Sequence, residues 1–421
     1  MRILTALCLF AATTCDAIPE APQPSAYQLP TGRATHSEAL ASIEARLRGA
    51  RARAAEQPDR WMAHEAVATA VMDRARLTGS LEDYAFAQQA LALAFEAAPG
   101  SGPHLSQAAL DYTLHRLAEV EPSLQAVEAR VLLDDSTRAA VLGLRGDLRL
   151  QQGLRADAVE LLQEAEAQDP TSRSASRLAH LHWRGGAIGT AEQWYRVAQD
   201  RYHGTDPQPR AWVHLQLGLI DLEYGRYGEA LRHYLDANEE LSGYYLVEEH
   251  VAEVLYLMGH VSEALGLYMD IIERTAGPEF MDAVAKIFLA AQRPDLARPH
   301  IEAARAIYQR QLVSFPEASY GHALAHFLAF GPSATAVDLA ENNHALRPNG
   351  EASRLLAEAY LQDDQLGNAV TAVEAALTSG WVSPTLYDTA ARVYAAAGNA
   401  TQAQKHRGLA CAQNPHLCNA D

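Results

Sequence analysis

Histidines are the first residues to consider for chemistry, because imidazole binds transition metals and transfers protons near neutral pH. The 421 residues include seventeen of them. His322 and His326 stand four residues apart, a helical spacing that can hold a metal. However, the sequence between them lacks the glutamate of the H-E-x-x-H zinc protease motif, and no third ligand stands nearby. His180 and His182 are two residues apart and point to different helix faces. These histidines are therefore expected to be structural, and no metal or other cofactor is predicted.

The sequence also lacks the motifs of the common enzyme classes. It contains no G-x-S-x-G nucleophile elbow, no phosphate-binding loop and no G-x-G-x-x-G fingerprint on a strand–helix unit. No run of β-branched residues predicts the strands on which a nucleotide-binding fold is built. The paired acids Glu239-Glu240 and Glu248-Glu249 are interpreted as solvated helix faces. The chain is therefore not expected to be an enzyme.

Two cysteines near the end of the chain have the spacing of a disulfide. Cys411 and Cys418 flank Pro415, and in an oxidising compartment they would close a short loop. The alternative is a pair of free thiols in a frayed tail. A zinc site with His406 and His416 is not favoured, because the cysteines lack the C-x-x-C spacing.

Residues 1–17 have the pattern of a secretory signal peptide. One arginine precedes an apolar run and then small residues, and the run is too short for a permanent membrane span. The residues before Cys15 resemble the lipobox of bacterial lipoproteins, with Ala12 where leucine is usual. Two outcomes stay open, namely lipidation at Cys15 and ordinary cleavage after Ala17. Either one predicts an exported protein, in the periplasm or anchored to the outer membrane of a bacterium, that touches membrane only through an anchor.

Two segments precede the main body of the chain. Residues 18–34 contain four prolines and no apolar periodicity, which predicts a flexible or extended tether. Residues 35–58 begin with the capping-box spacing of Thr35 and Glu38 and continue as a basic amphipathic helix. Such a helix can lie on a membrane surface, but here it is favoured as an N-terminal cap.

Small residues recur along the rest of the chain at intervals of 33 to 39 residues. They are Ala158, Ala191, Ala230, Ala264, Ala297, Ala336, Ala369 and Ala403. This period is typical of a solenoid of helix pairs. Two helices cross closely only where side chains are small, and a large residue four positions later fills the space beside the crossing.

Further columns appear when these alanines are aligned. The clearest copy carries Trp212, Leu217, Gly218, Gly225, Tyr227, Ala230, Tyr234 and Ala237. The columns resemble the tetratricopeptide repeat. That resemblance implies an all-α superhelix of about ten helix pairs over residues 59–415, followed by a tail at 416–421.

Several positions depart from the pattern or mark its turns. One repeat carries Leu324, Ala340 and Asn343 at unusual positions, and Arg407 departs in the last repeat. An insertion is expected at 201–210 and a lengthened second helix at 306–316. Gly331 is expected to be a counterpart of the turn residue Gly225, and Pro122 to lie near an interhelical turn.

The resemblance also implies where a partner would bind. In tetratricopeptide solenoids the first helices line a concave groove, and positions two, five, nine and sometimes twelve of each repeat face into it. Here these positions are Arg173, Ser176, His180, Trp183, Trp212, Glu249, Glu253, Asp282, Lys286, Glu351, Arg354, Glu358, Asp388 and Arg392. Arg173, His180 and Trp183 are the strongest candidates, because Arg and Trp are enriched at binding hot spots.

Charge narrows the class of partner. The net charge is −18, which argues against nucleic acid because phosphate binding needs a basic face. The predicted function is an exported scaffold that binds a protein or peptide partner in the bacterial cell envelope. The alternative is an accessory subunit of an envelope enzyme or of a metal or assembly system, with histidines as ligands.

Overall fold

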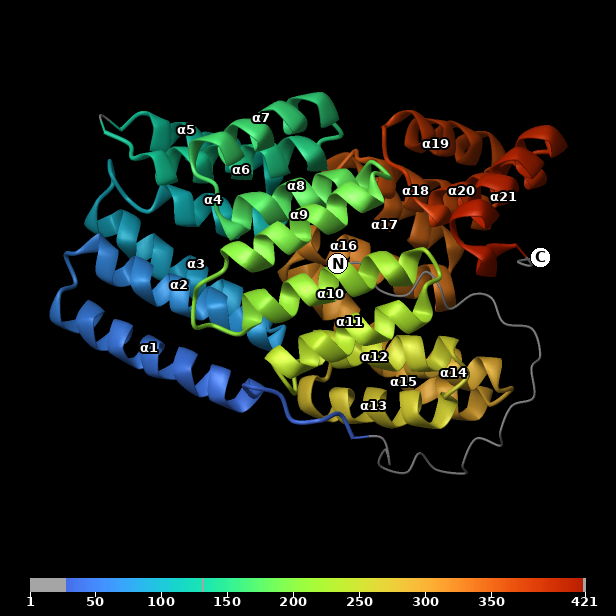
Figure 1. Cartoon of the computed structure of the whole chain (residues 1–421), viewed down its shortest axis with the longest axis horizontal. Helices are drawn as coiled ribbons and strands as arrows, with labels where there is room; N and C mark the ends of the chain where they lie inside the picture. The colour runs from blue at the N-terminus through green and yellow to red at the C-terminus, as the bar shows by residue number, and fades with distance from the viewer. Residues whose placement is uncertain (1–27, 131, 419–421) are drawn as a thin grey trace.

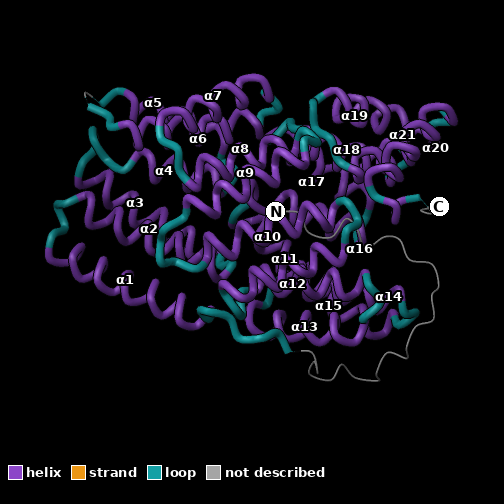
Figure 2. Tube along the Cα trace, in the orientation of Figure 1, coloured by secondary structure: helices purple, strands orange, loops and turns teal. Residues whose placement is uncertain are grey.

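The computed structural model describes residues 28–130 and 132–418, and these residues form α-helices joined by short turns (Figure 1). Figure 2 shows no strand in this part of the chain. The helices are α1 (His36–Glu56), α2 (Trp61–Thr78), α3 (Leu81–Ala97), α4 (His104–Thr113), α5 (Leu117–Glu128), α6 (Asp135–Gln151), α7 (Arg155–Gln168), α8 (Ser172–Arg184), α9 (Ile188–Arg201), α10 (Gln208–Glu223), α11 (Tyr227–Glu240), α12 (Tyr245–Leu257), α13 (Val261–Thr275), α14 (Pro278–Ala290), α15 (Pro294–Ser314), α16 (Pro316–Phe330), α17 (Ser333–Leu346), α18 (Gly350–Gln362), α19 (Leu366–Thr378), α20 (Pro384–Ala396) and α21 (Ala400–Gln413), with a short 3₁₀ turn at Pro415–Leu417.

From α2 onward the helices pack in consecutive pairs, α2 with α3 through to α20 with α21. The even-numbered helices are the first helices of each pair and the odd-numbered helices are the second. This arrangement confirms the predicted all-α solenoid of about ten helix pairs. The remaining helix, α1, begins with the expected capping box at Thr35 and packs its apolar face on α2.

The periodic alanines lie at the helix crossings, as their size requires. Those from Ala158 to Ala369 are 0% exposed. The residues four positions later include Leu162, Tyr195 and Tyr234, which are also buried. Ala403 in α21 is partly exposed, because no further pair stacks on the last repeat. The period therefore marks packing positions.

The positions that depart from the repeat pattern lie in ordinary helices and loops. The insertion is the loop between α9 and α10, and the lengthened helix is α15. Leu324, Ala340 and Asn343 are buried in a regular pair. One expectation is wrong, because Pro122 lies inside α5. Gly331 lies in the turn between α16 and α17 as expected, although its backbone is extended (φ −108°) where that of Gly225 is left-handed (φ +72°).

The superhelix closes on itself, so that turns of early repeats touch connections of repeats five places later (Figure 1). The turn after α6 meets the α17–α18 connection, where the side chain of Asn349 donates a hydrogen bond to Gln151 (3.0 Å). The turn after α8 meets the α19–α20 connection, where the Val382 amide donates to the Arg184 carbonyl (2.9 Å). The turn after α10 meets the end of α21, where His416 stacks on Tyr227 with ring centroids 4.3 Å apart.

We call the early and late repeats that meet in this way the two layers of the superhelix. Glycine is needed where a turn of one layer approaches the other. Gly153 has φ +74°, and a Cβ there would lie 2.5 Å from the carbonyl oxygen of Pro348. Gly186 has φ +76°, and a Cβ there would lie 2.7 Å from the side chain of Val382. The turn glycines thus serve both the local turn and the contact between layers.

Residues 28–34 contain no helix and are held against the end of α11. The Pro30 carbonyl accepts from Asn238 (2.7 Å), and the Arg33 guanidinium pairs with Glu239 and Glu240. The predicted signal peptide, Cys15, Ala17 and most of the tether lie outside the described residues. Among the described helices, none combines the length and apolar character needed to span a membrane.

Candidate functional site

The predicted groove residues of α18 and α20 form a single chain of ion pairs. Arg354 is 1% exposed and bonds both Glu351 (2.9 Å) and Glu358 (2.8 Å). Glu358 in turn accepts from Arg392 (2.9 Å), which also pairs with Asp388 (3.2 Å). Although burial works in the opposite direction, the guanidinium groups of Arg354 and Arg392 lower the pKa of Glu358. The structure therefore brings these five predicted residues together, as partners of one another.

Arg407 extends the same chain from the last helix. Its guanidinium pairs with Asp388 and donates to the Leu417 carbonyl (3.2 Å). The departure of Arg407 from the repeat pattern is thus explained by an ion pair within the last repeat.

Four carboxylates on α12 and α14 form a second group, which we call the acidic patch: Glu249, Glu253, Glu279 and Asp282. His250 lies between the first two, 3.3 Å from Glu249 and 3.1 Å from Glu253. His326 of α16 bonds Asp282 through Nδ1 (2.8 Å).

Burial raises the pKa values of carboxyl groups in the acidic patch. Loss of water raises the pKa of Glu249 well above its usual value and raises that of Glu279 to about 7. Burial also raises the pKa of Asp282, against the opposing effects of His326 and Lys286. The patch therefore holds carboxylates in surroundings that disfavour their charged form.

The cluster predicted on α8 is only partly formed. Trp183 is buried in the core between α8, α9 and α10, and its indole N–H donates to Glu223 (2.8 Å). His180 meets this indole edge-on at 6.0 Å, whereas Arg173, at the start of α8, is exposed. The expectation that Trp183 faces an open groove is corrected, because its side chain fills the joint between two repeats.

The other predicted positions differ in exposure. Trp212 is 36% exposed and meets Tyr195 edge-on at 6.2 Å. Lys286 is half-buried, and Ser176 donates to the Ser172 carbonyl (2.9 Å) within its own helix. Among the aromatic positions predicted for the groove, Trp212 is therefore the accessible one.

Two features of the inner face, which is the concave side lined by the first helices, were not predicted from the sequence. Glu279 stands at position two of its repeat, by the same register that selected Asp282 at position five, so the register itself could have found it. Arg177 and Asp147 form an ion pair (2.7 Å) between α8 and α6. Asp147 lies in the repeat before the first predicted groove position, which is why it was overlooked.

His326 is a structural residue and the two C-terminal cysteines are reduced. His326 is fully buried among the rings of Tyr308, Phe327 and Phe330, which agrees with a structural role. Cys411 and Cys418 are free thiols in this structure, and burial together with the nearby Cys418 raises the pKa of Cys411 to about 11, so the disulfide stays a prediction.

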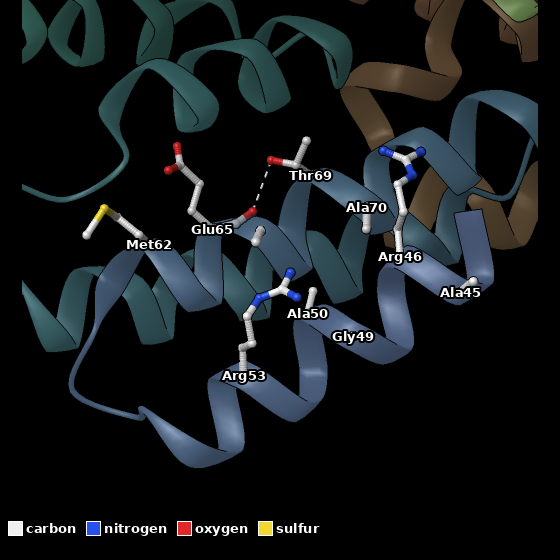
Figure 3. A pocket seen from close by; sticks show the side chains of 10 residues that line it. Ala45, Arg46, Gly49, Ala50, Arg53, Met62, Glu65, Thr69 and Ala70 are labelled. Atoms are coloured by element: carbon white, nitrogen blue, oxygen red, sulfur yellow. Dashed lines mark hydrogen bonds between the residues drawn. The ribbon is translucent and has the colours of Figure 1, made fainter. Parts of the chain in front are cut away.

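A shallow depression of about 460 Å³ lies between α1 and α2 (Figure 3). Small residues such as Gly49 and Ala70 create it, and Arg46 and Arg53 overhang it from α1. The Glu65 carboxylate accepts from Ser106 (2.6 Å) and is thereby held by the protein itself. The depression is open to solvent, and we interpret it as a gap between two helices.

Comparison with known proteins identifies no family for this chain. No family model matches the sequence, and no curated protein matches it. A tetratricopeptide repeat protein from Parabacteroides merdae is 14% identical, with a TM-score of 0.36, and the match covers 59% of this chain and 97% of that one. A thermophilic tetratricopeptide repeat protein from Thermus thermophilus is 21% identical, with a TM-score of 0.36, covering 44% of this chain and 98% of that one. By its own helix pairs and repeat columns, the chain is an all-α, tetratricopeptide-like solenoid.

Proposed function

We propose that this chain is an exported tetratricopeptide-like scaffold that binds a protein or peptide partner in the bacterial cell envelope. The acidic patch on α12 and α14 is the observation that carries the proposal. Carboxylates that have lost water gain the most from a nearby positive charge. The expected partner therefore presents lysine or arginine to the patch, from an extended segment or a helix.

The burial of the acidic patch determines how a partner can enter. Glu249, Glu253 and Asp282 are buried in the closed superhelix. Binding at the patch therefore requires the groups that cover these carboxylates to move, and the cost of that movement reduces the affinity.

Affinity capture from cell-envelope extracts tests the proposal, with the full chain as bait. The double variant Glu249→Gln, Glu279→Gln removes two carboxyl groups that can ionise opposite a cationic partner, with little change in shape. Capture should fall at least about tenfold, because charge pairs at an interface contribute a few kcal/mol. Added salt should release the captured partner from the parent chain.

A matched control uses the same change on the other helices of the same two repeats. Glu273 of α13 and Glu302 of α15 are exposed, and the variant Glu273→Gln, Glu302→Gln should capture as well as the parent. Equal capture by all three chains, with unchanged far-UV circular dichroism, would remove the acidic patch from the proposed function.

The envelope location rests on the pattern of residues 1–17. Fractionation of cells expressing the parent and Cys15→Ala separates the two forms of that proposal. A lipidated chain moves from the membrane to the soluble periplasmic fraction on substitution, whereas a chain cleaved after Ala17 keeps its location.

A further inference from the structure

A group of three metal-ligating side chains lies in the fifth helix pair, away from the inner face. His214 comes from α10, and His233 and Asp236 come from α11, three residues apart. One ligand atom from each lies within 4.8 Å of the other two. No other such group of three or more His, Cys, Asp or Glu side chains occurs among the described residues.

The two histidines direct the same ring atom toward one carboxylate oxygen. Nδ1 of His214 lies 3.9 Å from Oδ2 of Asp236, and Nδ1 of His233 lies 3.8 Å from it. Both Nδ1 atoms are buried and neither has a hydrogen-bond partner. A buried polar atom without a partner is costly, so two of them converging on a carboxylate point to a ligand.

On these grounds we propose that His214, His233 and Asp236 bind a divalent transition-metal ion, with Zn²⁺ as the preferred occupant. Two imidazole nitrogens and one carboxylate oxygen are a common zinc donor set, and they leave a fourth position for water or a partner side chain. Ligands of one Zn²⁺ at about 2.0–2.2 Å are about 3.3–3.5 Å apart. The two His–Asp separations therefore need to close by about half an ångström, and the His–His separation, which is at most 4.8 Å, by at most about 1.4 Å, which side-chain rotations supply.

The surroundings provide second partners for both rings. Oδ2 of Asp221 lies 3.6 Å from Nε2 of His233, in the carboxylate–histidine arrangement typical of zinc sites. Asp221 is itself held by Arg226 (2.6 Å). The side-chain nitrogen of Gln199 lies 2.9 Å from Nε2 of His214 and donates a hydrogen bond to it. When Nδ1 of His214 binds a metal, the ring hydrogen moves to Nε2, and the Gln199 amide turns over so that its oxygen accepts that hydrogen.

The charge state of the rings suits metal binding. Burial lowers the pKa of His214, and burial with nearby Arg232 lowers that of His233 to about 4. Both rings are therefore neutral at pH 7, the form that coordinates a metal without first losing a proton.

Arg232 competes with the metal for the same groups. Its guanidinium donates to Nε2 of His233 (2.9 Å) and pairs with Asp236 (3.3 Å). With Nε2 of His233 accepting, the ring hydrogen is on Nδ1. Binding moves that hydrogen to Nε2, where Asp221 accepts it, and displaces Arg232, whose side chain is 59% exposed.

Titration with Zn²⁺ alone tests the site, using the full chain without a histidine tag, stripped of metal and with its thiols alkylated. The parent should bind one Zn²⁺ per chain in a saturable step. His214→Gln and Asp236→Asn should each weaken that step by at least about tenfold, since even outer partners change metal affinity by 10–100-fold. Arg232→Gln should strengthen it, which an unfolded variant cannot do.

His260 provides the matched control. It stands three residues before Glu263, with Nδ1 and Oε1 3.7 Å apart, but belongs to no group of three ligands in the described chain. His260→Gln should leave Zn²⁺ affinity unchanged. The proposal is overturned if the parent shows no saturable binding, or if His214→Gln and His260→Gln bind Zn²⁺ as the parent does.

Discussion

The side-chain amide of Asn414 donates a hydrogen bond of 3.1 Å to the backbone carbonyl of Glu223, across 191 residues of the chain. The other atom of the same amide accepts from the backbone N–H of His416 (3.0 Å). It also lies 2.4 Å from where a Cβ on Gly225 would be. One side chain thus ties the last repeat to a turn of the fifth, and the solenoid is closed.

Gly153→Ala should weaken this closure. The substitution adds the cost of a left-handed alanine, about 1–2 kcal/mol, and a clash with the Pro348 carbonyl, about 1–3 kcal/mol more. Gly398→Ala is the control, because Gly398 has φ +77° and nothing within 4 Å of its Cβ position. Chemical denaturation and small-angle scattering measure both variants. A larger radius of gyration is expected only for Gly153→Ala, and identical behaviour would contradict the role assigned to the contact.

Arg354→Met should lower the free energy of unfolding by about 3–5 kcal/mol, because it leaves Glu351 and Glu358 without their buried cation. The control is Arg196→Met, since that side chain is 62% exposed and pairs with Glu192 at 3.5 Å. Exposed pairs contribute about 0–1 kcal/mol. Urea denaturation at constant salt compares the two, and similar losses would mean that the buried network adds nothing.

Glu279 should make the protein less stable as pH rises from about 4.5 to about 7. Burial raises its folded-state pKa to about 7, whereas the unfolded value is 4.5. Between these values the folded state holds a proton that the unfolded state has released, so the free energy of unfolding falls with pH. The loss is on the order of 2–3 kcal/mol. Denaturation from pH 4 to 8 should show a flatter profile for Glu279→Gln, and an unchanged profile would assign the slope to other groups.

Trp183→Ala should lower the free energy of unfolding, and any loss of partner binding should follow from that loss of stability. The side chain is 2% exposed and fills the joint between two repeats, so its removal should cost about 3–5 kcal/mol. The half-buried neighbour His180 offers a comparison, because His180→Ala leaves that joint filled. Thermal denaturation with far-UV circular dichroism checks both. A Trp183→Ala chain as stable as the parent would return this residue to the candidate partner surface.

Oxidation should join Cys411 and Cys418 in an exported chain. Their thiols are close enough in the reduced structure for Cys418 to raise the pKa of Cys411, and closing this short loop stabilises the protein by roughly 2.5 kcal/mol. Mass spectrometry of the non-reduced mature protein should find the two cysteines in one linked species that alkylation does not label. Two labelled thiols would exclude the bond and weaken the case for export.

The sequence by itself determined the local architecture. Ala230 and Tyr234 repeat at fixed intervals, and each repeat packs mainly on its neighbours, so the helix pairs follow from contacts close in the chain. The register also selected Glu351, Arg354 and Glu358 before their ion pairs were seen. Their partners lie within one or two helical turns or in the next repeat.

Only the tertiary structure decided how the repeats are arranged as a whole. The contact of Asn414 with Glu223 depends on small rotations summed over five repeats, and no local pattern specifies that sum. Trp183 was misplaced because its repeat position does not reveal how deeply the neighbouring repeat covers it. His214 and His233 are 19 residues apart on different helices, and their common approach to Asp236 depends on the packing of α10 against α11. Periodicity fixes which residues face a neighbour, whereas the curvature and packing of the assembled solenoid fix which distant groups meet.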